Sequence, residues 1–225
     1  MASVDISYPI GMINVPRTAT TLDGFRTWTR SDGYPEHGRI TFVGGRLFID
    51  MSPERYETHL KIKETINRVI GTLVADRDLG DFYPDGGFIT HKEAGISNEP
   101  DGMFATWETL ESRRLAPPQD RPQDGTHIEL VGTPDWVCEI VSDSSVEKDA
   151  EVLREAYYRA SVAEYWLIDA SGTKIDIQIL VYQPGGYVPV KDDNGWFDSP
   201  VFGCEFQLTR HRDRLDRWRY ALAVR

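Results

Sequence analysis

Long apolar runs are missing from this 225-residue chain, and cysteine is scarce. No stretch approaches the roughly 20 consecutive apolar residues that a membrane-spanning helix needs. The segment from Met1 to Pro16 has neither a basic start nor a long apolar core, so we expect no secretory signal. Cys138 and Cys204 form no metal-binding motif, and two isolated cysteines suit a reducing compartment. These absences predict a cytoplasmic protein with no membrane partner.

Positive charge is also in short supply. The 25 Lys and Arg residues face 36 Asp and Glu residues, which gives a net charge of −11. This balance argues against a general nucleic-acid coat protein, because phosphate contacts need clustered Lys and Arg. The run from Arg210 to Arg219 is an exception and is locally positive. It is either a phosphate-contacting segment or the charge-mixed surface of a helix, and the helix surface is the favoured interpretation.

The remaining composition is that of a globular protein, with 40% hydrophobic and 11% aromatic residues. We find no internal repeat, linker or low-complexity tract, so the sequence predicts an arm over residues 1–19 and a single domain over residues 20–225. Hydrophobic periodicity and turn residues predict a short helix capped by Thr21, a β-hairpin over 39–51 and a long helix from Ser52 or Glu54 to about Asp76. Further along the chain they predict strands at 88–91 and after Pro100, a loop at 111–127 and a C-terminal helix at 209–223.

The segment from Thr133 to Ser142 (TPDWVCEIVS) predicts a strand buried on both faces. Side chains alternate along a strand, so Val137, Glu139 and Val141 share one face. A carboxylate in a buried strand is costly unless a cation, a metal or hydrogen bonds compensate it. Glu139 is therefore either one half of a structural ion pair or part of a metal or catalytic site.

The residues after this strand predict a strand–helix–strand unit. A helix is expected over about 145–160, with Asp149, Leu153 and Tyr157 among its inward residues, followed by a strand over 164–169. Such a unit joins parallel strands through a right-handed crossover. Residues 175–190 then predict a second hairpin that extends the sheet. The fold class is α/β, with a mixed sheet flanked by helices and with N-terminal and C-terminal hairpins.

Pro100-Asp101 at the start of one strand, followed by Glu139 within another, resembles the core of the PD-(D/E)XK nucleases. Phosphodiester hydrolysis needs a hard divalent cation that neutralises the phosphate and acidifies a water molecule. Mg²⁺ prefers oxygen ligands. The resemblance implies that Asp101, Glu139 and the backbone carbonyl of Ile140 bind Mg²⁺ or Mn²⁺. The second Pro-Asp pair, at Asp135, is expected only to open the central strand.

The wider chain resembles the Uma-two family of restriction-endonuclease-like proteins over roughly residues 20–208. The resemblance rests on Gly45-Arg46-Leu47, Met51-Ser52-Pro53, His59, Glu99-Pro100-Asp101, the 133–142 segment, Asp149, Tyr157 and the 162–169 segment (VAEYWLID). It implies a restriction-endonuclease-like fold and a Mg²⁺-dependent endonuclease acting on nucleic acid, with DNA the expected substrate. A homodimer is left open. His59 falls on or beside the buried stripe of its helix and is a candidate catalytic residue.

The chain departs from the family pattern at its basic residue. The position two residues after Glu139 is Val141, and family members instead place a Lys four residues before the tyrosine. That position is Leu153 here, so Arg154 and Lys148 are the candidates for the basic role. A guanidinium can stabilise phosphate charge but is a poor proton acceptor. Two alternatives to an active nuclease follow: a nuclease fold that binds nucleic acid or protein without cutting, and a structural module with an incidental buried Glu139.

Overall fold

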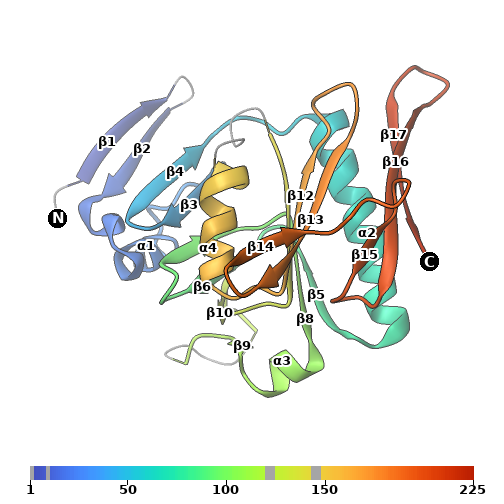
Figure 1. Ribbon diagram of the computed structural model, residues 1–225. Helices are drawn as coiled ribbons and strands as arrows, with labels where there is room; N and C mark the ends of the chain where they lie inside the picture. Colours follow the sequence, from blue (N-terminus) through green and yellow to red (C-terminus); the bar gives the residue numbers. More distant parts are fainter. Residues whose placement is uncertain (1–2, 9–10, 120–124, 143–147) are drawn as a thin grey trace.

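The computed structural model describes residues 3–8, 11–119, 125–142 and 148–225, with side chains from residue 13 onward. Its centre is a six-stranded mixed sheet in the order β14-β13-β12-β11-β8-β5 (Figure 1). The strands are β5 (Gly80–Pro84), β8 (Gly102–Thr106), β11 (Trp136–Ile140), β12 (Glu164–Asp169), β13 (Asp176–Gln183) and β14 (Gly186–Pro189). Strand β11 therefore lies in the interior of this sheet, which agrees with its continuously apolar sequence.

A second six-stranded sheet has the order β4-β3-β7-β6-β10-β9 and carries the predicted hairpin at 39–51. Its strands are β3 (Arg39–Val43), β4 (Arg46–Asp50), β6 (Phe88–His91), β7 (Ile96–Asn98), β9 (Leu115–Ala116) and β10 (Glu129–Gly132). The helix α1 (Leu22–Trp28) covers this sheet, and the Thr21 side chain accepts a hydrogen bond from the amide of Gly24, as predicted for an N-cap. Between these parts, α3 (Trp107–Glu111) follows β8.

Two helical segments cover opposite faces of the central sheet (Figure 1). On one face, η2 (Tyr56–Leu60) continues into α2 (Lys61–Arg77), so the long helix begins slightly later than expected. On the other face lie η3 (Lys148–Leu153) and α4 (Arg154–Arg159). The first residues of the expected 145–160 helix, 145–147, lie outside the described residues. All five positions expected to face inward on this helix are buried: Asp149, Leu153, Ala156, Tyr157 and Ala160.

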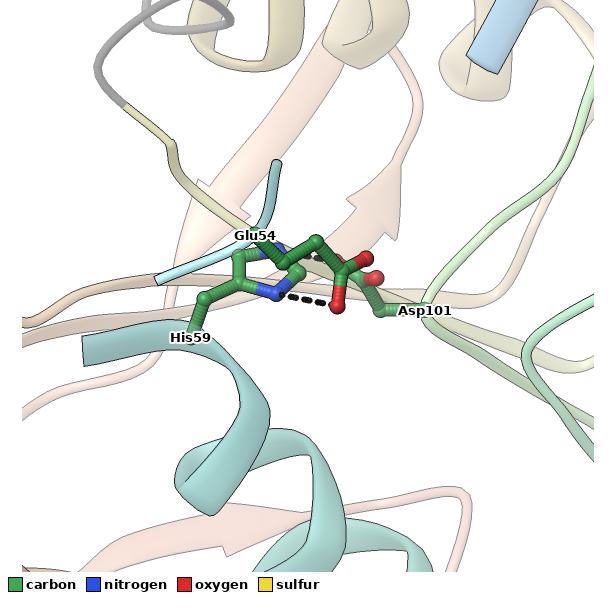
Figure 2. A group of neighbouring side chains, drawn as sticks. All are labelled: Glu54, His59 and Asp101. Atoms are coloured by element: carbon green, nitrogen blue, oxygen red, sulfur yellow. Dashed lines mark ion pairs between the residues drawn. The ribbon is translucent and has the colours of Figure 1, made fainter. Parts of the chain in front are cut away.

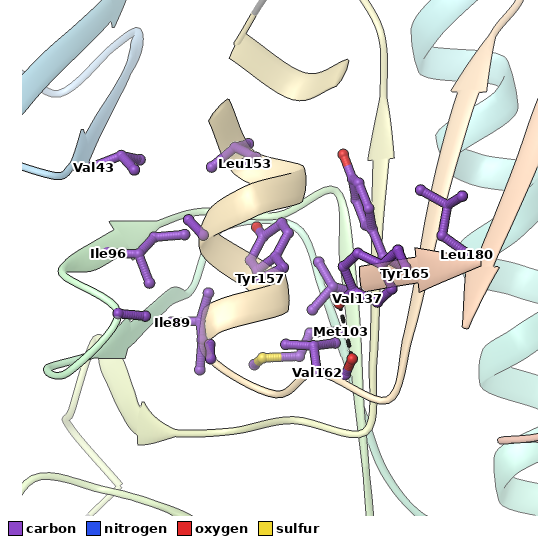
Figure 3. Close-up of a cluster of buried hydrophobic side chains, with 14 of the residues drawn as sticks. Val43, Ile89, Ile96, Met103, Val137, Leu153, Tyr157, Val162, Tyr165 and Leu180 are labelled. Atoms are coloured by element: carbon purple, nitrogen blue, oxygen red, sulfur yellow. Dashed lines mark hydrogen bonds between the residues drawn. The ribbon is translucent and has the colours of Figure 1, made fainter. Parts of the chain in front are cut away.

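The alternation predicted for β11 divides the core into two clusters. Val137 and Val141 pack with Leu153, Tyr157 and neighbours under α4 (Figure 3). Trp136, Cys138 and Ile140 pack under α2 with the C-terminal strands. Strand β11 pairs in parallel with β12 and antiparallel with β8, so the predicted parallel pairing is confirmed, whereas the right-handed crossover stays a prediction. The hairpin formed by β13 and β14 is confirmed as well.

Two terminal predictions are wrong. Residues 209–223 do not form a helix, because β16 (Cys204–Arg212) and β17 (Trp218–Val224) pair as an antiparallel hairpin, with β15 (Phe197–Ser199) beside them. Alternate residues of these strands, among them Leu208 and Leu222, are buried in the α2 cluster, which is strand periodicity. At the N-terminus, β1 (Ser3–Tyr8) and β2 (Gly11–Pro16) form a hairpin where a loose arm was expected. The domain boundary at residue 20 stays a prediction.

Candidate active site

Glu139 is a buried carboxyl group with neutral hydrogen-bond partners. Its Oε1 accepts hydrogen bonds from the Asn98 side-chain amide and from the Tyr157 hydroxyl, each at 2.7 Å. The side chain of Asn98 in turn accepts one from the Thr41 hydroxyl. Burial, together with the negative charge of Asp149, raises the pKa of Glu139 to about 8. The carboxyl is therefore mainly protonated at neutral pH unless a cation arrives.

Asp101 lies directly before β8, on the strand next to Glu139. Strands β8 and β11 pair with Gly102 opposite Cys138, and Asp101 and Glu139 each adjoin that pair, close enough for the charge of Asp101 to raise the pKa of Glu139. Asp101 Oδ2 also accepts a hydrogen bond from the amide of Ile140 at 2.7 Å. The fold thus brings together the two carboxylates that the sequence singled out.

Asp101 differs from Glu139 because cations surround it. Arg39 donates to its Oδ1 at 2.8 Å, and the ammonium of Lys63 lies 3.1 Å from the same oxygen. Burial by itself would raise the pKa of Asp101, but His59, Arg39 and Lys63 outweigh it and hold the pKa well below its usual range. Two adjacent carboxyl groups therefore have pKa values shifted in opposite directions, a pattern that favours a functional site.

Arg39 and Lys63 are each shared among several acids. Arg39 lies 2.7 Å from Glu54 and 2.8 Å from Asp85, in addition to its bond with Asp101. Lys63 lies 2.6 Å from Glu54 and 2.8 Å from Asp85. Four parts of the chain supply this network: β3 provides Arg39, α2 provides Lys63, and the segments before η2 and after β5 provide Glu54 and Asp85.

His59 extends the network at the start of the long helix (Figure 2). Its Nε2 lies 3.5 Å from Asp101 Oδ2, and its Nδ1 lies 3.4 Å from Glu54 Oε2. Burial lowers the pKa of His59, but its interactions with the carboxylates of Asp101 and Glu54 outweigh burial and raise the pKa to about 9. The imidazole is therefore charged at neutral pH and helps to keep both carboxylates ionised.

A cleft of about 500 Å³ opens beside this network. Arg39, His59, Glu54 and Asp85 contribute to its wall, as does Glu99, whose pKa is raised by burial and by the charge of Asp85. Val141 and Ser142 line it as well, so the cleft lies where β11 ends. A substrate in this cleft has access to the residues that follow Glu139 and to the cations around Asp101.

The two candidate basic residues lie in different places. Lys148 lies 3.2 Å from Asp149, and its positive charge lowers the pKa of Glu139. The guanidinium of Arg154 instead lies 3.5 Å from the carbonyl of Tyr187, at the β14 hairpin. Leu153, at the position of the family lysine, is fully buried among apolar side chains (Figure 3). The structure therefore brings Lys148 to Glu139 and Asp149 and does not bring Arg154 there.

The model of the Uma2 family, described as "Putative restriction endonuclease", matches residues 23–211. The chain belongs to the Uma2 family. Among solved structures, a crystal structure from Anabaena variabilis, described as a putative nuclease of the DUF820 group, has the same fold. It is 20% identical, with a TM-score of 0.58 over 81% of this chain and 90% of the other. No curated protein matches the chain. Among the described residues, no helix has the length and apolar character needed to cross a bilayer.

A divalent cation fits the donors in this Uma2 chain. Asp101, Glu139 and the carbonyl of Ile140 are hard oxygen donors of the kind that Mg²⁺ prefers. Glu139 is buried and its hydrogen-bond partners Asn98 and Tyr157 are neutral, so its ionised form needs compensation of the kind that a bound cation provides. The carboxylate of Asp101 is already contacted by four groups: the side chains of Arg39, Lys63 and His59 and the amide of Ile140. A carboxylate offers roughly four lone-pair positions, so a metal ion that binds Asp101 must replace one of these groups. Within the described residues, Glu54, His59 and Asp101 also lie close enough together to hold a metal.

Sequence reasoning missed most of the cations and hydrogen-bond donors of this Uma2 site. Lys63 carried a usable signal, because it follows His59 by four residues and such pairs share a helix face. Asn98 ends a buried strand two residues before Pro100, and an amide there needs partners. Arg39 and Asp85 carried no local signal. Asp135 has the expected structural role, since its carboxylate accepts hydrogen bonds from the amide and hydroxyl of Thr106.

Proposed function

We propose that this Uma2 chain is a Mg²⁺- or Mn²⁺-dependent endonuclease that hydrolyses phosphodiester bonds of DNA in the cytoplasm. The observation that carries the proposal is the pair Asp101 and Glu139, which are buried beside an open cleft, interact electrostatically and are shifted in pKa in opposite directions. Asp101, Glu139 and the carbonyl of Ile140 are the proposed metal ligands. The ion supplies charge neutralisation at the phosphate and acidifies a water molecule.

The other proposed roles belong to side chains around the two carboxylates. Lys148 provides an ammonium next to Glu139, where positive charge stabilises the negative charge that develops on a phosphate during hydrolysis. His59 keeps Asp101 ionised through its raised pKa of about 9. Tyr157 and Asn98 orient the Glu139 carboxyl by donating to one of its oxygens. Arg154 has no part in this proposal, because its guanidinium is directed at Tyr187.

The test is cleavage of supercoiled plasmid and of single-stranded DNA with Mg²⁺ and with Mn²⁺. We expect Asp101→Asn and Glu139→Gln to reduce cutting to the level seen with a chelator. Asp176→Asn, an exposed acid-to-amide change on β13, is the matched control and should cut like the wild type. Cleavage that survives both site variants would contradict the proposal.

A second function is favoured by Leu153, which leaves the family's lysine position apolar and fully buried. In that case the chain binds nucleic acid or a protein without cutting it. A wild type that binds Mn²⁺ in a calorimeter but cuts neither DNA form would select this function. An absence of any Mg²⁺ or Mn²⁺ binding would instead select the structural module with an incidental buried Glu139.

A further inference from the structure

The C-terminal hairpin concentrates positive charge in an acidic protein. Residues 210–219, here called the basic tip, contain five Arg and two Asp, whereas the whole chain has a net charge of −11. They form the end of β16, the turn and the start of β17. A helix over the same residues would place Arg210, Arg214 and Arg217 on one face and Arg212 and Arg219 on the opposite face. The hairpin gathers them at one end of a two-stranded ribbon instead.

The basic tip is attached to the turn of chain that carries His59. The amide of Trp218 donates to Glu57 Oε2 at 2.8 Å, and the ammonium of Lys61 donates to the carbonyl of Trp218 at 2.8 Å. Glu57 and Lys61 lie on either side of His59 in the sequence. Arg55 and Thr58, in the same stretch of chain, line the cleft. Figure 1 shows the hairpin with its turn toward the end where α2 begins. The basic tip therefore lies next to the rim of the cleft.

The arginines of the basic tip are partly held in place and carry more charge than their acids can balance. Arg210 and Arg212 lie over the ring of Trp218, at 4.1 and 3.6 Å from its centroid. This stacking restricts two long side chains before any ligand arrives, so less freedom is lost on binding. Arg217 and Arg219 share one carboxylate, that of Asp213.

Arg214 is fully at the surface of the turn. It is exposed and has no ion pair with any described residue. With Arg219, whose side chain is 59% exposed, it offers guanidinium groups to solvent that a polyanion can reach. Arg–phosphate contacts are the main sequence-independent source of affinity for nucleic acids. The acidic remainder of the chain repels a polyanion, so attraction is directed to this part of the surface.

We infer that the basic tip binds the sugar–phosphate backbone of the nucleic acid, on the strand that leaves the cleft. The inference rests on the proposed function, because it takes nucleic acid as the substrate. It assigns the C-terminal hairpin to substrate binding, away from the two carboxylates. The tip carries no reacting group, so it contributes to affinity and to its salt dependence.

The test compares two double variants with the wild type. Arg214→Gln/Arg219→Gln removes two charges from the tip and spares the stacking on Trp218. Arg159→Gln/Arg225→Gln is the matched control, since these side chains are 46% and 50% exposed and Arg225 lies at the other end of the same hairpin. Fluorescence anisotropy measures binding to a labelled 30-base-pair duplex of mixed sequence and to its single strand. EDTA prevents cutting, and the salt concentration varies from 50 to 200 mM.

The slope of log affinity against log salt falls by about 0.9 for each lost duplex phosphate contact. We expect the tip variant to lose about 1.8 from this slope and the control variant to lose nothing. Across a fourfold change in salt, the affinity of the wild type then falls about tenfold more than that of the tip variant. Equal slopes in all three proteins would overturn the role of the tip while leaving the nuclease proposal intact. A wild type that binds neither probe would also overturn the role of the tip, whereas the nuclease proposal is decided by the cleavage test with Mg²⁺ and Mn²⁺.

Discussion

Replacing Glu139 with Gln isolates the cost of a buried carboxyl without disturbing its surroundings. Glu139 Oε1 accepts its hydrogen bonds from Asn98 and Tyr157, and the carbonyl oxygen of Gln can accept both. The two side chains have nearly the same volume, so packing under α4 is retained. Only the ability to ionise is lost. A pH-dependent difference in unfolding free energy between the wild type and Glu139→Gln therefore reports on the ionisation of Glu139 itself.

The sign and size of this difference follow from the pKa. In the folded protein the pKa of Glu139 is raised from 4.5 to about 8, so the folded state binds a proton that the unfolded state releases. The free energy of unfolding then falls as pH rises from about 4.5 to about 8. At about 1.4 kcal/mol per pKa unit, the loss approaches about 5 kcal/mol at most when Glu139 is fully ionised. Glu139→Gln avoids this loss, so its advantage over the wild type grows between pH 5 and pH 9.

Urea denaturation in EDTA at pH 5 and pH 9 measures this advantage. Glu111→Gln, at an exposed position of α3, is the control and should follow the wild type at both pH values. Saturating Mn²⁺ should narrow the difference in unfolding free energy at pH 9, because the ion binds ionised Glu139 and stabilises the wild type by about 2.7 kcal/mol at a hundred times its Kd. An advantage that is the same at pH 5 and pH 9 would refute the reasoning, since Glu139 would then ionise as freely in the folded protein as in the unfolded one.

Two further predictions concern Lys148 and a second buried acid. Lys148→Met should reduce the rate of metal-dependent DNA cleavage by about 10²–10³-fold, the usual cost of losing one charge-stabilising donor. Arg154→Met should leave the cleavage rate within a few-fold of the wild type. Equal losses in the two variants would place the basic role elsewhere. Burial raises the pKa of Glu164 to about 7, so its contribution to stability falls by about 3 kcal/mol as pH rises from 4.5 to 7. Urea denaturation of the wild type and Glu164→Gln at pH 5 and pH 8 measures the difference in their unfolding free energies. This difference should shift in favour of the variant as the pH rises, and a difference that stays constant would contradict the prediction.

The central strand was predictable because its sequence pattern and its environment agree. Alternation placed Glu139 on the same face as Val137 and Val141, and the structure puts both valines in the cluster under α4. Asp101 was also within reach of sequence reasoning, since Pro100-Asp101 directly precedes a strand. The pairing of β8 with β11, which brings the two acids close to each other, is a tertiary fact. It had to come from the family resemblance.

The C-terminal hairpin was mispredicted because its charged residues hide the strand period. Between Thr209 and Arg219 the only apolar residues are Leu215 and Trp218, so no alternation is visible there. The signal lies at the turn instead. The carboxylate of Asp213 accepts hydrogen bonds from the amides of Leu215 and Arg217, which is turn chemistry that a short polar residue supports. Asp216 completes the turn with a φ of 55°.

The distribution of cations explains why two neighbouring carboxyl groups behave so differently. Arg39 and Lys63 are both directed at Asp101, together with His59, so its negative charge is compensated before any metal binds. Glu139 has Lys148 nearby, but Asp149 competes for that ammonium at 3.2 Å. The sequence shows which carboxyls are buried, and it cannot show which cation each of them receives, because β3, α2 and η3 meet only in the folded chain. This distribution of cations keeps Asp101 permanently ionised, whereas the charge of Glu139 depends on a bound cation.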